Sequence, residues 1–283
     1  MQKDEGISVK CIDFDQHFER YTRLWMEENA EKYNNNMDVI ESMMPEIYMG
    51  FLSTPAQWLD GVSPEDYFEQ FDDAQMLTKW MCEYYEQGVP VPDLLLERMT
   101  TLGEDAEKAL KQLPFAENVP HEASLTAISL LREMESTVLL EEYVAFIAGL
   151  NEPDEKGDMC AEALESAGYA VVETMLAAVD TATQTGRDIL ADILSNYPGD
   201  DRIFELLMER FSYCTDRRAL FASYLAKFGD ERALPALMNA AQDDEVNYLD
   251  YVEIVSAIDA LGGERPPERE FSGDPYYESL KQI

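Results

Sequence analysis

Residues 199–208 read GDDRIFELLM, and residues 229–238 read GDERALPALM. The second stretch begins 30 residues after the first, and Gly, Asp, Arg, Leu and Met recur in register. A glycine followed by an aspartate is typical of a turn that ends one helix and caps the next. A unit of two helices and a turn that recurs with a period in the thirties predicts an α-solenoid, in which successive helix pairs stack.

The helices that precede these turns repeat as well. Ala-x-x-Leu patterns end at Leu164, Leu194 and Leu225, at intervals of 30 and 31 residues. Weaker matches to the same anchor position extend the series to Met99, Leu130 and Ile258. One helix pair cannot bury both of its apolar faces, so several stacked pairs are required. We therefore expect the three anchor leucines to be buried at equivalent places on successive first helices.

A family resemblance rests on these turns. Residues 228–237, FGDERALPAL, resemble the HEAT-like (armadillo-type) repeats that are common in bacterial proteins. Residues 101–110, TLGEDAEKAL, are similar but match less closely, and the resemblance extends over about residues 92–262. It implies a right-handed αα superhelix of HEAT-like helix pairs. It says little about function, because such repeats serve as scaffolds for many activities.

The N-terminal part of the chain is also predicted to be helical. Apolar residues recur at helical spacing over residues 15–33 and 37–52, where Pro45 predicts a break. Ser63 and Pro64 are typical of a helix start, and a longer helix is expected over residues 74–86. Alternating strand patterns are scarce, so the fold class that we expect is all-α: a helical N-terminal region followed by the solenoid.

Two prolines and a glycine between Gln87 and Pro92 predict a boundary between the two parts. Near the end of the chain, glycines and prolines prevent a long helix, whereas Phe271 and several later apolar residues offer anchors. We expect this tail to fold back and cap the solenoid. The expected organisation is a helical region at 1–88, a HEAT-like solenoid at 89–262 and a capping tail at 263–283.

The chain of 283 residues is strongly acidic. It contains 58 Asp and Glu residues against 21 Lys and Arg residues, a formal net charge of −37, and both halves are acidic. This balance argues against binding to nucleic acid or to an anionic membrane through a basic surface. The acidic surface is explained either by solubility or, more specifically, by a basic partner or by mimicry of nucleic acid.

The sequence offers little for catalysis. The four cysteines are far apart, so no Cys-x-x-Cys motif exists, and the two histidines, His17 and His121, do not form a ligand cluster. Phosphate-binding loops, nucleophile elbows and zinc-protease motifs are absent. We therefore expect no metal site, no cofactor and no catalytic residues. The N-terminus shows no signal-peptide pattern and the chain no long apolar run, so we expect a cytoplasmic protein.

The function that these patterns favour is a non-catalytic scaffold or adaptor that binds a protein or peptide on an acidic solenoid surface. Second helices are expected to line the concave side of the solenoid. The candidate partner-binding residues on them are Glu142, Tyr143, Glu173, Arg202, Glu205, Glu209 and Tyr213. Two alternatives stay open: an acidic mimic of nucleic acid that inhibits a basic protein, and an enzyme with a carboxylate site in the groove between the two parts.

Overall fold

A computed structural model describes residues 11–33 and 36–280, and it confirms the all-α fold. Every regular element of these residues is a helix, and extended pairing is limited to one isolated bridge between Ala56 and Val62. The chain forms two compact units, unit 1 (Met1–Val138) and unit 2 (Leu139–Ile283).

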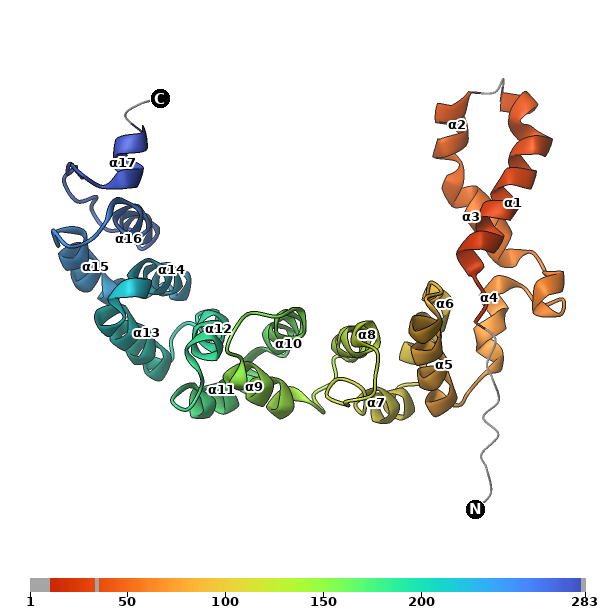
Figure 1. The fold of residues 1–283 in the computed structure, drawn as a ribbon, viewed down its shortest axis with the longest axis horizontal. Coiled ribbons are helices and arrows are strands. Elements are labelled where there is room, and N and C mark those ends of the chain that lie inside the picture. The colour runs from red at the N-terminus through yellow and green to blue at the C-terminus, as the bar shows by residue number, and fades with distance from the viewer. Residues whose placement is uncertain (1–10, 34–35, 281–283) are drawn as a thin grey trace, which may run out of the picture. The chain divides into compact units, whose positions relative to one another are not determined.

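Unit 1 contains the helices that precede the predicted solenoid and the first helices assigned to it (Figure 1). Their bounds are α1 (Phe14–Asn29), η1 (Ala30–Tyr33), α2 (Met37–Ser42), α3 (Met44–Ser53), η2 (Gln57–Leu59), α4 (Pro64–Tyr67), η3 (Phe68–Gln70), α5 (Ala74–Gln87), α6 (Asp93–Thr101), α7 (Glu104–Leu110) and α8 (His121–Glu133).

Local sequence explains where these helices begin and end. The break predicted around Pro45 is found at Met43, which ends α2 and precedes α3, and Pro45 lies in the first turn of α3, where its missing N–H costs least. Pro64 begins α4, as predicted. Asp73 caps α5, since its carboxylate accepts a hydrogen bond from the backbone N–H of Met76 at 3.1 Å.

Unit 2 is a series of helix pairs. Their bounds are α9 (Leu140–Gly149), α10 (Glu155–Ser166), η4 (Gly168–Val171), α11 (Val172–Val179), α12 (Gln184–Leu194), α13 (Asp201–Tyr213), η5 (Thr215–Arg217), α14 (Arg218–Phe228), η6 (Glu231–Ala233), α15 (Leu234–Ala241), α16 (Tyr248–Ala260) and α17 (Pro275–Leu280).

The repeated glycine–aspartate turns adopt the expected geometry. Gly199 and Gly229 have φ angles of 93° and 80°, a left-handed conformation that glycine adopts without strain. Asp200 and Asp230 follow them and cap the next helix, each accepting a hydrogen bond at 2.9 Å from the backbone N–H two residues later. The recurring sequence therefore encodes a recurring helix–turn–helix connection.

The anchor leucines are buried as predicted. Leu164, Leu194 and Leu225 are fully buried on α10, α12 and α14, the first helices of three successive pairs. In Figure 1 these helices and α16 form one row of unit 2, and α9, α11, α13 and α15 form the other. Figure 1 places this second row on the outer side of the bend that unit 2 makes, and not on the concave side that the sequence suggested.

The division between the compact units differs from the predicted boundary at residue 88. Gly88 ends α5 in a left-handed conformation, and the chain then turns through Pro90 and Pro92 into α6, which packs against α5. The glycine and prolines therefore form a turn within unit 1. The two units instead divide after Val138.

The described part of the tail contacts the last helices of unit 2. The Arg269 guanidinium donates to the backbone oxygens of Ala241 and Asp243 at 3.0 and 2.7 Å. Phe271 is 7% exposed, and its ring lies 4.9 Å from that of Tyr251 in α16. These contacts cover the end of α15 and one side of α16.

Candidate functional site

The outer row of unit 2 carries a ladder of ion pairs between successive helices. Arg202 of α13 donates to both carboxylate oxygens of Glu173 in α11, at 2.8 and 2.6 Å, and to the capping Asp200 at 2.7 Å. Arg232 of η6 repeats the arrangement. Its guanidinium donates a hydrogen bond to the carboxylate of Asp201 in α13 at 2.7 Å and another to the capping carboxylate of Asp230 at 2.6 Å. The repeated arginine thus joins each turn to the preceding second helix.

These hydrogen bonds favour the ionised carboxylates. The guanidinium of Arg202 lowers the pKa of Glu173 and of Asp200 below the ordinary range of carboxyl groups. Arg232 does the same to the pKa of Asp230. Glu173 and Arg202, two of the predicted partner-binding residues, therefore already have partners within the repeat.

Three other candidates share one exposed stripe of α13. Glu205, Glu209 and Tyr213 lie at intervals of four residues, so their side chains fall on the same helix face. Tyr213 is 80% exposed. Neither glutamate has a hydrogen bond or ion pair to any residue in the described ranges. We call these three residues the α13 stripe.

The remaining two candidates lie on α9. Glu142 is exposed near the start of the helix. Tyr143 is 2% exposed, which corrects the prediction that it lies on a binding surface. Leu140 and Ile147, three residues before it and four residues after it, are buried too, because positions at this spacing share the apolar face of α9.

Two features of the described residues bear on the alternative of a carboxylate-based site: clusters of metal-ligating side chains and carboxylates with a raised pKa. No group of three or more His, Cys, Asp or Glu side chains that could hold a metal ion is found within residues 11–33 and 36–280. Burial raises the pKa of Asp188, but this carboxylate forms an ion pair with Arg217, which acts in the opposite direction. The pair connects α12 to η5 and is best explained as a structural contact.

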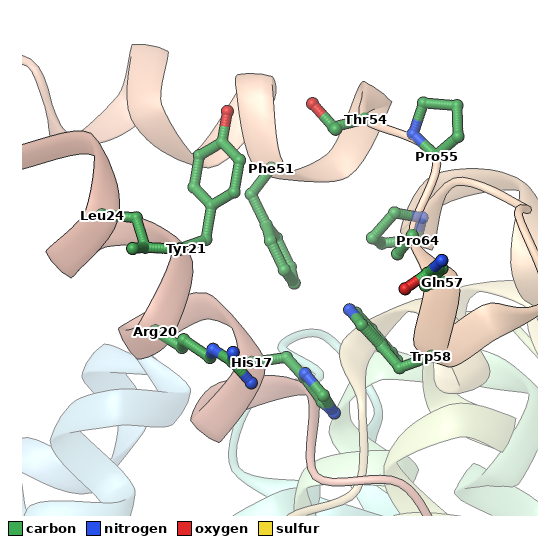
Figure 2. A pocket seen from close by; sticks show the side chains of 11 residues that line it. His17, Arg20, Tyr21, Leu24, Phe51, Thr54, Pro55, Gln57, Trp58 and Pro64 are labelled. Carbon is green, nitrogen blue, oxygen red and sulfur yellow. The ribbon is translucent and has the colours of Figure 1, made fainter. Parts of the chain in front are cut away.

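A cavity of about 590 Å³ lies in unit 1, between α1, α3 and the segment around η2. Figure 2 shows the side chains of Arg20, His17 and Trp58 along one side of it and those of Tyr21 and Phe51 opposite. The complete lining consists of His17, Arg20, Tyr21, Leu24, Phe51, Thr54, Pro55, Ala56, Gln57, Trp58 and Pro64.

Packed rings hold the walls of this cavity in place. The imidazole of His17 stacks on the indole of Trp58, with centroids 3.8 Å apart and planes 8° apart. The Trp58 ring also stacks on the Phe51 ring, with ring centroids 6.3 Å apart. On the opposite wall, the absence of a side chain at Gly50 leaves space for Tyr21, because a Cβ atom at Gly50 would lie only 3.0 Å from the hydroxyl of Tyr21. The aromatic walls are thus fixed by contacts that do not involve a ligand.

The cavity differs in charge from the rest of the chain. No Asp or Glu side chain lines it, whereas Arg20 does. The Arg20 guanidinium makes no hydrogen bond or ion pair within the part of the chain that the structure describes. The sequence did not reveal this site, because its residues come from three separate segments and aromatic residues at helical spacing are more typical of a core.

Comparison with known proteins identifies one repeat. Residues 218–243, which cover α14, η6 and α15, match the model of the PBS lyase HEAT-like repeat. The chain thus contains a HEAT-like helix pair at the place where the sequence predicted one. No curated protein and no solved structure matches the chain. No helix in the described ranges is both long enough and apolar enough to cross a membrane.

Proposed function

We propose that this protein is a non-catalytic scaffold that binds a basic protein or peptide on the outer row of helices in unit 2. The observation that carries the proposal is the α13 stripe, where two glutamates without ion pairs share one helix face with an exposed tyrosine. A cationic segment would pair with Glu205 and Glu209 while an apolar or cationic side chain packs on Tyr213.

The repeat architecture supports this role. HEAT-like units present side chains on successive parallel helices, and such surfaces commonly bind other proteins. The anchor residues Met99, Leu130 and Ile258 are buried like the three leucines, which supports a run of repeats over about residues 92–262. The Arg202 and Arg232 ladder connects neighbouring second helices of the acidic row by hydrogen bonds within the chain.

Charge favours a basic partner over other classes. The excess of acidic residues raises the association rate with a cationic protein and repels duplex DNA. The attraction is screened by salt, with a screening length of about 8 Å at physiological ionic strength. Binding through the α13 stripe is therefore expected to weaken as salt is added.

The test compares partner capture by the protein and by a charge-neutral variant of the stripe. Glu205→Gln with Glu209→Gln should reduce capture of basic proteins by about tenfold or more, since it removes two charged contacts. The matched control is Asp158→Asn with Glu253→Gln, which removes two exposed acids from the other row of helices, on α10 and α16.

The outcomes separate the possibilities. Partners that are lost with the stripe variant, retained with the control and released by salt support the proposal. Equal capture by both variants contradicts it. If the captured partner is a nucleic-acid-binding protein and duplex DNA displaces it, the surface acts as a mimic of nucleic acid.

A further inference from the structure

We propose that the cavity of unit 1 binds a small aromatic carboxylate, with its ring among the aromatic walls and its carboxylate on Arg20. This inference is independent of the partner-binding role of unit 2, because every residue that carries it belongs to α1, α3 or the segment around η2.

The size and walls of the cavity suit one small flat molecule. Ligand sites typically enclose about 300–1,000 Å³, and the volume of about 590 Å³ falls within this range. Tyr21 and Phe51 pack with ring centroids 5.7 Å apart, and Trp58 and His17 form the opposite stack. A planar ring would gain offset-stacked or edge-to-face contacts on these walls.

The charge of the lining selects an anion. Aromatic walls alone would also suit a quaternary ammonium group, but the guanidinium of Arg20 would repel a cation. In a chain with 58 acidic and 21 basic residues, the guanidinium has no acidic partner among the described residues and no acid lines the cavity. A carboxylate is the anion that fits a guanidinium in a planar, bidentate geometry.

Other polar groups of the lining could form hydrogen bonds with a substituent on the ligand ring. Thr54 and Gln57 also line the cavity and carry a hydroxyl and an amide group (Figure 2). The hydroxyl of Thr54 is engaged with the backbone oxygen of Gly50 at 2.5 Å, so Gln57 offers the more available hydrogen-bonding group. These positions suit a polar substituent on the ring, and the charge at Arg20 remains the main determinant of binding.

The test uses 2-naphthoate and its uncharged amide, 2-naphthamide, as probes of the full chain. Ligand-observed NMR titrations give the two dissociation constants. We expect 2-naphthoate to bind about tenfold or more tightly than the amide, because only the acid can form a charge-assisted, bidentate pair with the Arg20 guanidinium. Equal affinities, or no saturable binding of the acid, would overturn the proposal.

Two variants localise the binding. Arg20→Gln should abolish the preference for the acid, whereas Arg23→Gln should preserve it. Arg23 is a matched control, since it lies one turn further along α1, is exposed, has no ion pair in the described ranges and does not line the cavity. If both variants lose the preference for the acid equally, the preference depends only on the general positive charge of α1, and the proposal is wrong. If Arg20→Gln keeps the preference, the acid does not bind at Arg20, and the proposal is wrong as well.

A third comparison fixes the class of ligand. N-acetyl-phenylalanine and a hexapeptide that ends in phenylalanine present the same ring and carboxylate. A small-molecule site should bind both with similar affinity or favour the smaller compound. Affinity for the hexapeptide that is about tenfold or more tighter would overturn the proposal of a small ligand and would indicate a peptide-end site.

Discussion

Gly186 lies in α12 where a methyl group has no room. A Cβ atom at this position would stand 2.9 Å from the Cα atom of Ala148 in α9 and would overlap the backbone oxygen of Ile147. We expect Gly186→Ala to lower the free energy of unfolding by about 1–3 kcal/mol, because the two backbones must separate. Urea denaturation followed by circular dichroism measures the change.

Gly149 provides the control for this substitution. It is the last residue of α9, a Cβ atom there would meet no other atom within 4 Å, and its φ angle is not positive. Gly149→Ala should leave stability unchanged or raise it by up to about 1 kcal/mol. Equal effects of the two substitutions would show that helix contact at Gly186 is unimportant.

The anchor position at Leu225 makes a second prediction at this scale. The side chain is fully buried in α14, so Leu225→Ala should cost about 2–5 kcal/mol through lost burial and the cavity that remains. Leu249→Ala on α16 is the control, since that side chain is 51% exposed and should change stability by less than about 0.5 kcal/mol. A cost below about 1 kcal/mol at Leu225 would contradict the repeat assignment.

Periodicity explains why some residues could be predicted and others could not. Leu164, Leu194 and Leu225 were recognised because burial at equivalent repeat positions imposes the same residue at a fixed spacing. The prediction that Tyr143 lies on a binding surface is wrong, because its spacing from Leu140 and Ile147 assigns it to the apolar face of α9. Tyrosine occurs at both buried and exposed positions, so the residue type alone does not show that Tyr143 is buried.

At the scale of elements, the ladder of Arg202 and Arg232 makes stability depend on pH. The pKa values of Glu173, Asp200 and Asp230 are lowered in the folded chain, so the unfolded chain binds protons first as the pH falls. The stabilisation is complete above the ordinary carboxyl range of about pH 4 and is lost as the pH falls through the lowered values.

The measurement compares unfolding free energies between about pH 5 and pH 2. In the variant with Arg202→Gln and Arg232→Gln, stability should decrease less steeply over this window than in the unaltered chain. Arg23→Gln is the control, as it removes a guanidinium that has no ion pair within the described ranges. An identical pH dependence in all three proteins would show that the ladder does not contribute.

Connections between elements were harder to predict than the elements themselves. The helix start at Pro64 and the break near Pro45 follow from local backbone chemistry, and the sequence placed both. A glycine followed by prolines gives the same local signal at a turn within a unit as at a boundary between domains. The compact units divide after Val138, whereas the sequence predicts a boundary at residue 88. The cavity depends on three segments that meet only in the folded unit, and no local pattern marks it.

At the scale of the whole molecule, a chain of stacked repeats has ends that need cover. The final pair of unit 2 would expose Tyr248 and Tyr251 of α16 if the tail were absent. Phe271 packs on both rings, and Asp274 accepts a hydrogen bond from the backbone N–H of Tyr248 at 3.0 Å. These contacts support the proposal that the tail acts as a cap, and residues 281–283 of the predicted tail lie outside the described residues.

Removal of residues 263–283 should therefore lower the melting temperature by about 5 °C or more, because several kcal/mol of burial and hydrogen bonding are lost. Phe271→Ala should reproduce a large part of the decrease, since this ring is the buried centre of the contact. Glu270→Ala is the control, as this neighbouring side chain is exposed and should leave the melting temperature within about 1 °C. If the truncated chain melts at the same temperature as the full chain, the tail does not stabilise the repeats, and its aromatic residues become available to a partner.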